Sequence, residues 1–564
     1  MKSRILAILN IRAGEERNVF LMLAQYFFMG AAMLFVQSAS LALFFTVWDS
    51  TAMPYIYLGI AVIVSSITAI FLKISERTSL ARFLILSVLF VLIGSIALRM
   101  GLAFTNSKWL LLALPIWSQT LVNLTVTAFW TLAGNIFDIR QGKRIFGLMN
   151  AGSWLAYVVM GPFTTPLVNA IGTENLYFVI AACLLIAFLL QQAVIRANPS
   201  TQAAPEVIEG QPLQTSILQL FRIRYIVLIF ALITLWRISY FILDNVFYDR
   251  AALQYPTADG MAGFIGGFFG LVGILGFITD MFLTGRIISR FGLRAGLLAT
   301  PTLTVLCMAA LAATGTIDPQ ALTLLFWLAV SGKFINEGLG FSLDQTAQNL
   351  LYQPIHEQIR ARAQTITEGI IQPLAIGLAG GLLLLFNTIL KFNATQLTYM
   401  YLIAAAIWIV VCIALIRAYP VALTEALHKR RFGDKGILLT DSASIQIVRN
   451  ALKSNHASEV IYALDLLEKG ESDTLSMDIA ASICSQIPEV RQDAIKRAER
   501  LKLSVLLPVI QTQLKSEDDP KVRETASCAL IVLGADSNTA LNLLAQEDVA
   551  TKRGAMIGSL RSSA

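Results

Sequence analysis

The chain has 564 residues, of which 56% are hydrophobic and only 14% are charged, and its formal net charge is +7 at pH 7. Soluble domains carry about 25% charged residues, so this composition excludes a wholly soluble globular protein. The basic balance does not require a nucleic-acid partner, because membrane proteins gather Lys and Arg in the loops of one side.

Residues 1–18 combine charged and apolar side chains, as the start of a signal peptide does. However, no small-residue cleavage site follows, and the apolar run that begins at Val19 continues to Trp48. We therefore expect a cytoplasmic amphipathic segment over residues 1–18.

Between Val19 and Tyr419, apolar runs of about 20–28 residues alternate with short polar breaks, and about 20 residues suffice for a helix to cross a bilayer. The pattern predicts an all-α polytopic membrane protein with twelve transmembrane helices. We place these spans at about 19–48, 53–74, 82–105, 109–139, 145–170, 174–195, 225–248, 262–285, 293–315, 320–350, 361–390 and 396–417.

Lys and Arg gather in alternate connections between these spans, whereas the other connections contain little beyond Lys108, Arg250 and Lys391. Because Lys and Arg bias a loop toward the cytoplasm, the alternation predicts that both chain ends are cytoplasmic. We expect a multi-pass protein of the cell's inner (plasma) membrane.

A linker at 197–224, rich in Pro, Gln and Ser over 197–216, separates six spans at 19–196 from six spans at 225–418. Two six-helix halves are the plan of the major facilitator architecture, whose site lies near the midplane between the halves. A basic junction at 419–440 follows the second half.

The two halves repeat a polar stripe. Asn135 and Asn349 stand 214 residues apart, and the spans that precede them can be compared at this offset. In span 10 the stripe contains Lys333, Glu337, Asp344 and Gln348, which correspond in span 4 to Gln119, Asn123, Trp130 and Gly134. At about 100° per residue, each set falls on one face of its helix, which predicts a functional face.

Charged side chains inside a membrane require a partner or a wet cavity. Lys333 and Glu337 are one turn apart, so they form either an internal ion pair that holds the bundle or the lining of a binding cavity. Continuation of the stripe favours the cavity. Gln37 interrupts span 1, and Arg237 and Asp244 share one face of span 7. We predict a substrate site made of Gln37, Gln119, Asn123, Trp130, Arg237, Asp244, Lys333, Glu337, Asp344 and Gln348.

Coupling and gating residues are predicted in span 11 and in two cytoplasmic loops. If transport is coupled to protons, Glu368 in span 11 is the first choice, since a buried carboxylate can take up a proton. The loops contain "RQGKR" and "LLYQPIHEQIRARAQTITEG". Their basic residues serve either as gates or as simple topology anchors: Lys143, Arg144, Arg360 and Arg362.

Cysteine and histidine patterns predict no metal site and no cofactor. The five cysteines include no C-x-x-C, and the three histidines lack ligand spacing. No G-x-x-x-x-G-K-[ST] occurs and no nucleophile–base constellation is visible, so we expect no enzyme. The glycines of span 8, including Gly266 and Gly270, are spaced for close helix packing.

The tail at 441–564 contains paired amphipathic helices. "PEVRQDAIKRAERL" (488–501) and "DPKVRETASCALIVLG" (519–534) align Val490 with Val522 and Arg491 with Arg523, a period of about 32. The pattern resembles HEAT repeats, which stack into an α-solenoid and bind proteins. We expect a HEAT-like domain with a protein partner, although regulation, assembly or stability remain alternative roles.

Four stretches carry a family resemblance: "FWTLAGNIFDIRQGKRIFGLMNAG", "FILDNVF", "TGRIISRFG" and "LLYQPIHEQIRARAQTITEG". They resemble the ATP/ADP translocase (NTP/NDP exchange) family, especially bacterial members with C-terminal HEAT-like repeats, over most of 12–418. The resemblance implies a major-facilitator-like ATP:ADP antiporter that moves a small anionic substrate, a nucleotide, across the lipid bilayer.

One stretch departs from the family. Its exchangers carry a basic residue in span 1 within a stretch similar to R-x-x-K-D, whereas this chain reads "FVQSASLALFF". The alternative is therefore a transport-inactive membrane scaffold or sensor that recruits a partner through its HEAT-like tail. A third alternative is an enzyme or lipid-handling protein of the same fold.

Overall fold

The computed structural model describes residues 15–105, 107–137, 139–198, 217–428, 442–454, 456–469, 475–534 and 537–562. Within these ranges the chain is helical and contains no strand, which confirms the all-α prediction. Most of the predicted N-terminal segment, most of the linker and the basic junction from residue 429 onward lie outside the described residues. The chain divides into two units: a membrane unit of 1–287, 294–350 and 361–415, and a tail unit of 416–564 that also includes the short segments 288–293 and 351–360.

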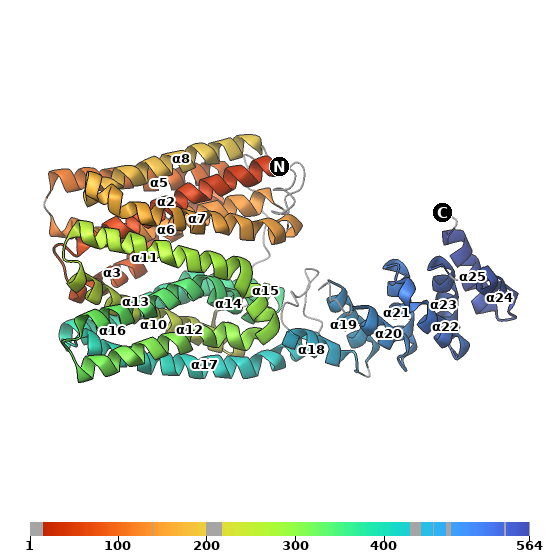
Figure 1. The fold of residues 1–564 in the computed structure, drawn as a ribbon. Helices are drawn as coiled ribbons and strands as arrows, with labels where there is room; N and C mark the ends of the chain where they lie inside the picture. Colours follow the sequence, from red (N-terminus) through yellow and green to blue (C-terminus); the bar gives the residue numbers. More distant parts are fainter. Residues whose placement is uncertain are drawn as a thin grey trace. The chain divides into compact units, whose positions relative to one another are not determined.

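The first half of the membrane unit is an antiparallel succession of long helices (Figure 1). Their bounds are α2 Glu16–Phe44, η1 Ser50–Ala52, α3 Met53–Gly59, η2 Ile60–Val64, α4 Ser65–Arg77, α5 Leu80–Phe104, α6 Lys108–Ile136, α7 Ile139–Ile171, η3 Thr173–Asn175 and α8 Leu176–Ala197.

The second half repeats this plan with more irregular helices. Their bounds are α9 Ile217–Leu220, α10 Arg224–Gln254, α11 Ala258–Ile278, η5 Thr279–Leu283, α12 Thr284–Ile317, α13 Leu322–Leu339, η6 Gly340–Asp344, α14 Gln345–Leu351, α15 Glu357–Ile366, η7 Thr367–Ile371, α16 Gln372–Leu383, η8 Leu384–Ile389 and α17 Ala394–His428.

Local chemistry explains where these helices begin and end. The Asp49 carboxylate accepts a hydrogen bond from the Thr51 amide at the start of η1. The Thr257 hydroxyl accepts from the Gly260 amide and caps α11. Gly172 ends α7 with φ +79°, a conformation that favours glycine.

Ten helices in the described residues are long and apolar enough to cross a membrane. One of them, Ala258–Ile317, has 60 residues, and Gly292 interrupts it with φ +70°. A 60-residue helix is about three times the minimum length for one crossing, and the break falls between the predicted spans 8 and 9. The count of twelve spans stays a prediction.

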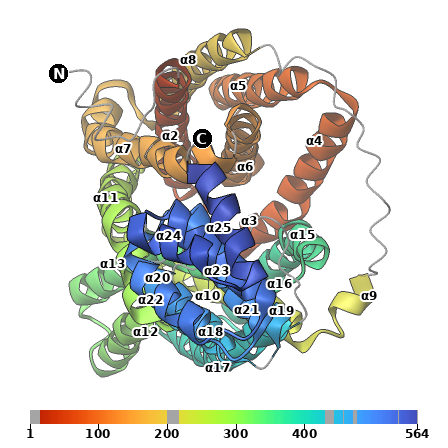
Figure 2. The ribbon, with the colours of Figure 1, turned by 90° about the vertical axis from the view of Figure 1, so that its right-hand side faces the viewer.

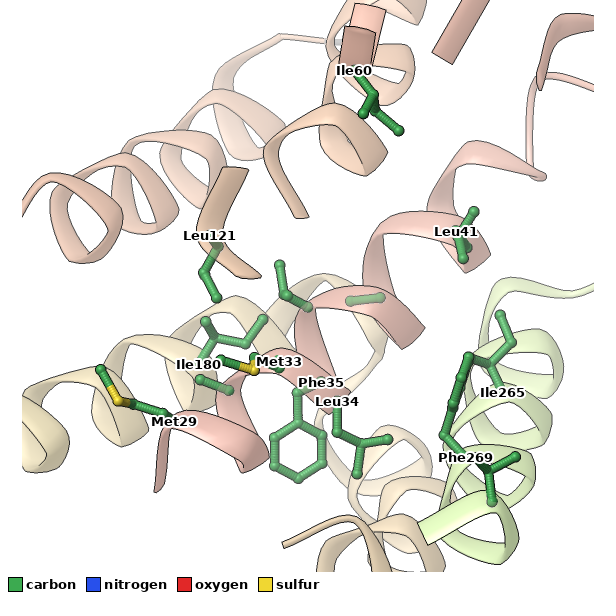
Figure 3. Close-up of a cluster of buried hydrophobic side chains, with 14 of the residues drawn as sticks. Met29, Met33, Leu34, Phe35, Leu41, Ile60, Leu121, Ile180, Ile265 and Phe269 are labelled. Carbon is green, nitrogen blue, oxygen red and sulfur yellow. The ribbon is translucent and has the colours of Figure 1, made fainter. Parts of the chain in front are cut away.

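The two halves pack around α2 and α11. Viewed end on, α5, α6 and α8 gather near α2, while α10, α12, α16 and α17 belong to the other half (Figure 2). Figure 3 shows Met29, Met33 and Phe35 of α2 among buried side chains of α6, α8 and α11. Apolar side chains thus join the halves along the first helix.

Glycines bring α7 and α11 into backbone contact. A Cβ added to Gly161 would lie 2.6 Å from the Gly270 Cα and 2.8 Å from the Gly266 carbonyl oxygen. Real atoms do not approach so closely, so these positions exclude any side chain. The prediction that the span 8 glycines serve helix packing is confirmed.

A second contact between the halves lies where α2 joins α3. The Ser50 hydroxyl donates to the Asp249 carboxylate over 2.6 Å, and its carbonyl oxygen accepts from Asn245 and Asn387 over 3.0 and 3.1 Å. Helix α16 packs against α3 here, since a Cβ on Gly380 would lie 3.2 Å from the Pro54 carbonyl oxygen.

The tail unit contains α18 Ser442–Ala451, α19 Ala457–Lys469, α20 Leu475–Ile483, α21 Pro488–Arg500, α22 Leu507–Lys515, α23 Pro520–Val532, α24 Ser537–Ala545 and α25 Val549–Ser562. Arg491 donates to the Glu517 carboxylate and to the Ser485 carbonyl, and Arg523 pairs with Asp548 and donates to the Glu517 carbonyl. The same arrangement therefore recurs at the predicted spacing. The HEAT-like assignment itself stays a prediction.

Candidate functional site

Two carboxylates share one lysine in the interior of the second half. The Lys333 Nζ lies 2.6 Å from the Asp244 Oδ1 and 2.6 Å from the Glu337 Oε1. The exposed fractions of these side chains are 0%, 11% and 3%. Glu337 reaches Lys333 because it is one turn further along α13, and Asp244 reaches it because α10 packs on α13.

Two tyrosines complete what we call the Lys333 cluster, which consists of Lys333, Asp244, Glu337, Tyr57 and Tyr240. The Tyr240 hydroxyl donates to the Glu337 Oε1 over 2.8 Å, and the Lys333 Nζ lies 4.0 Å from the centroid of the Tyr240 ring. The Tyr57 hydroxyl of α3 donates to the Asp244 Oδ2 over 2.9 Å. Since Tyr57 belongs to the first half, the cluster joins the two halves.

Charge is unbalanced in the Lys333 cluster, because two carboxylates face one ammonium. Tyr57 donates to the Asp244 Oδ2, which Lys333 does not reach, whereas Tyr240 donates to the same Glu337 Oε1 that Lys333 contacts. Lys333 and Glu337 thus form the ion pair that was one of the two interpretations of their spacing. Asp244 is a further partner of Lys333, which the sequence did not predict.

Arg237 lies on α10, two turns before Asp244. Its Nη2 donates to the Gln372 Oε1 of α16 over 2.6 Å, and its guanidinium lies 4.5 Å from the centroid of the Trp236 ring. Its Nε is buried without a hydrogen-bond partner, and among the described residues it forms no salt bridge. Arg237 therefore keeps donor capacity for an anion.

Asp344 lies apart from the Lys333 cluster although it shares the predicted stripe. Its Oδ1 accepts from the Thr300 hydroxyl of α12 over 2.7 Å, and its Oδ2 is buried without a partner. Gln348, one turn further on, is buried as well. The π-helical turn Gly340–Asp344 separates them from Glu337 and interrupts the regular spacing of about 100° per residue on which the predicted stripe depends.

The predicted positions of the first half differ in burial and in their contacts. Gln37 is the only residue between Met29 and Phe44 that is not buried. Gln119 is half-buried and Asn123 is exposed. Trp130 packs edge-on against Tyr26, Phe129 and Phe146. No hydrogen bond joins these predicted positions to the Lys333 cluster within the described part of the chain.

The structure describes the side chains of three of the predicted coupling and gating residues: Glu368, Arg360 and Arg362. Glu368 is exposed, in the π-helical turn η7. Arg360 and Arg362 lie on α15, and both are half-buried. The side chains of Lys143 and Arg144 lie outside the described residues, although α7 contains both positions.

Comparison with known proteins gives the family. The model of the TLC ATP/ADP transporter family matches residues 100–420, which is more than half of the chain. The chain belongs to this family. The matched residues include α10, α13 and α16, and hence the Lys333 cluster and Arg237, but not Tyr57.

Two ADP,ATP carrier proteins of Chlamydia trachomatis serovar D are similar to this TLC transporter family member. Carrier protein 1 is 22% identical over 48% of this chain and 56% of its own length. Carrier protein 2 is 22% identical over 59% of this chain and 69% of its own length. The chain thus spans about half the length of the first of these relatives.

A solved structure confirms the fold. The bacterial homologue of the iron transporter ferroportin, in its inward-facing state, superposes with a TM-score of 0.52 at 15% identity. The match covers 72% of this chain and 99% of that one. The major-facilitator-like architecture predicted from the sequence is therefore present in this family member.

Proposed function

We propose that the protein is a secondary active transporter that exchanges nucleotides of the ATP/ADP type by alternating access. Membership of the TLC family and similarity to proteins named ADP,ATP carriers support this activity. The observation that carries the proposal is the pair of cations Arg237 and Lys333 in the second half. Arg237 has no carboxylate partner among the described residues, and Lys333 shares its charge between two.

Arg237 is the primary anchor for phosphate in this proposal. A guanidinium binds phosphate through two parallel hydrogen bonds, and Trp236 and Gln372 hold this one in a fixed orientation. The unpartnered Nε supplies a donor that the protein itself does not use.

Lys333 couples the substrate to the closure of the halves. A second phosphate competes with Asp244 for the Lys333 ammonium, and Asp244 also holds Tyr57 of the other half. When the phosphate binds the Lys333 ammonium, Asp244, which links the halves through Tyr57, loses its salt bridge to Lys333. An empty carrier keeps the link and does not switch, which is the behaviour of an exchanger.

The remaining predicted residues have roles beside Arg237 and Lys333 in this proposal. We infer that Gln37, Gln119, Asn123, Trp130 and Gln348 contact the rest of the nucleotide, and that Glu368 supplies a counter-charge on the access path. Lys143, Arg144, Arg360 and Arg362 serve as basic gates at the cytoplasmic side.

The Lys and Arg pattern supports an orientation in the inner (plasma) membrane with both chain ends in the cytoplasm. The turn that contains Ser50 then lies at the outer side, where it ties the halves together. The tail is proposed to bind a protein partner through its repeated helices.

Thermal unfolding of the purified full chain tests the binding site, because a ligand that binds only the folded state raises the Tm. We expect ATP and ADP to raise the Tm of the wild type and of Arg99→Gln, but not of Arg237→Gln. Arg99 is the matched control, since it is a half-buried arginine held by an amide and an aromatic ring, Asn175 and Phe178. Equal shifts in both variants would remove Arg237 from the site.

The second candidate function is a membrane scaffold that no longer transports. It is favoured by the first span, which contains no charged residue between Val19 and Trp48. A folded protein whose Tm responds to no nucleotide, sugar phosphate, inorganic phosphate or carboxylate would make the scaffold the better account.

A further inference from the structure

Asp344 is a buried acid without a counter-ion. It is 4% exposed and lies in the π-helical turn η6. One carboxylate oxygen accepts from Thr300, and the other has no hydrogen-bond partner in the described part of the chain. Among the described residues, no Lys, Arg or His forms a salt bridge with it. A charged carboxylate at such a position would be both desolvated and uncompensated.

The ionisable groups around Asp344 supply no positive charge. Tyr401 and Cys412 of α17 are close enough to interact with it electrostatically. Tyr401 donates to the Thr304 hydroxyl over 2.7 Å, and Cys412 donates to the Leu297 carbonyl over 3.4 Å. On α12, Thr300 and Thr304 offer neutral hydroxyls, and Cys307 interacts with Tyr401.

The cations of α13 and α10 are bound by other groups. On α13, Lys333 is bound by Asp244 and Glu337. On α10, Arg237 donates to Gln372. A Cβ added to Gly340 would lie 3.8 Å from the Asp344 Oδ2 and 4.0 Å from the Trp236 ring, so Trp236 lies near this oxygen. The indole nitrogen of Trp236 is itself buried without a partner. The turn η5, which packs against η6, contains Asp280, whose carboxylate accepts from Asn150 and Trp154. Within the described residues, Asp344 is therefore an acid without a cationic partner.

The donor set at Asp344 suits a proton better than a metal ion. A hard cation takes about six or more oxygen ligands, whereas only one carboxylate and one hydroxyl meet here. Within the described chain, no group of three or more His, Cys, Asp or Glu side chains could hold a metal. Thr300 donates to Oδ1, which leaves Oδ2 as the atom to carry a proton.

We propose that Asp344 binds a proton at Oδ2 in this conformation, and that the carrier moves this proton in the same cycle as its anionic substrate. The step is a proton transfer alone. Water on one side supplies the proton, an O–H bond forms at Oδ2, and this bond breaks to water on the other side, with no change of oxidation state. This proton site differs from the predicted coupling residue, Glu368.

The helix that contains Asp344 connects the proton site with the anion site. Lys333 and Glu337 precede the π-helical turn, and Asp344 ends it. π-helical turns are frequent at functional sites, and a shift of this turn by one residue would rotate Asp344 by about 100° relative to Glu337. Anion binding at Lys333 can thus change the access of water to Asp344.

Infrared spectroscopy of the full chain tests the proton site without any substrate. A protonated carboxyl group has a C=O stretch that a carboxylate lacks. We expect a buried carboxyl band at pH 7 in the wild type and in Glu368→Gln, and its loss in Asp344→Asn. A band that persists in Asp344→Asn would overturn the proposal, and loss of the band in Glu368→Gln would transfer the site to Glu368.

Proton movement is measured with a pH-sensitive dye inside proteoliposomes while a nucleotide gradient drives the carrier. Asp344→Asn should lower substrate-dependent proton flux at least tenfold and remove the pH dependence of exchange. Unchanged proton flux in this variant would contradict the proposal. If no nucleotide is exchanged while the infrared band depends on Asp344, the nucleotide proposal fails and the proton site stands. Should Asp344→Asn not fold, Thr300→Val should shift the band to a different frequency, and an unshifted band would contradict the site.

Discussion

The membrane unit and the tail unit both bury ion pairs, but they balance the charges differently. In the tail, Arg491 and the Glu517 carboxylate form two hydrogen bonds, with one charge on each side. In the membrane unit, Lys333 faces two carboxylates, and none of the described Lys, Arg and His side chains forms a salt bridge with Asp344. A balanced pair is sufficient to hold a helix in place, whereas an unbalanced set can respond to an incoming anion or proton.

Removal of Lys333 should have the largest effect. Lys333→Met leaves Asp244 and Glu337 buried without a cation, which costs about 3–5 kcal/mol. We expect loss of nucleotide exchange and a much lower Tm of the purified protein. The triple variant that adds Asp244→Asn and Glu337→Gln should regain the Tm but not the exchange. Recovery of exchange in the triple variant would show that Lys333 has only a structural role.

Disruption of the balanced pair should act on stability alone. Burial favours a raised pKa for Glu517, but hydrogen bonds from Arg491, Gln513 and the Asp519 amide outweigh it and lower the pKa. The pair therefore stabilises the tail above the unfolded-state pKa of about 4.3, and this stability is lost as pH falls through the lower folded-state pKa. Glu517→Gln should destabilise the tail by about 3 kcal/mol at pH 7 and by less in acid.

Hydrogen exchange of α21 and α22 in the full chain measures this difference. The control is Arg500→Ala, because Arg500 is 61% exposed and its pair with Glu468 contributes at most about 1 kcal/mol. Equal protection in the wild type and Glu517→Gln at pH 7 would refute the stabilising role of the Arg491 pair.

Backbone contact between the halves should tolerate no added methyl group. Gly161→Ala forces α7 and α11 apart and should cost about 1–3 kcal/mol. Gly267→Ala is the matched control, since no atom lies within 4 Å of its added Cβ. The Tm values and exchange rates of the two variants provide the comparison, and identical values would contradict the close packing.

Removal of the hydrogen bond that links the halves at Tyr57 should have the smallest effect. Tyr57→Phe keeps the ring but removes the hydrogen bond to Asp244, worth about 0.5–1.5 kcal/mol. We expect a small loss of stability and an increase in transport by the empty carrier. The ratio of uptake into empty and ADP-loaded vesicles measures it, and an unchanged ratio would separate Tyr57 from switching.

Sequence patterns predicted the elements that depend on local composition. Apolar runs predicted the helices, and i to i+4 spacing predicted that Lys333 and Glu337 share a face. The spacing could not predict Tyr57 as a partner of Asp244, because the two lie 187 residues apart and Tyr57 belongs to an ordinary apolar run. Contacts between halves depend on how helices pack, which no single helix encodes.

Asp344 shows a different limit of sequence reasoning. The predicted stripe assumed about 100° per residue from Lys333 to Gln348, but η6 contains i to i+5 turns that interrupt the regular spacing. Asp344 consequently contacts Thr300 of α12 rather than the Lys333 cluster. No residue type in "GFSLD" signals this irregular turn in advance.

Counterflow in proteoliposomes of the full chain is the most direct test of the central claim, nucleotide exchange that depends on Arg237 and Lys333. We predict rapid uptake of labelled ATP into vesicles loaded with ADP, little uptake into empty vesicles, and at least a tenfold lower rate for Arg237→Gln than for Arg99→Gln. Uptake that is absent from folded wild-type protein, or equal in the two arginine variants, would contradict the account.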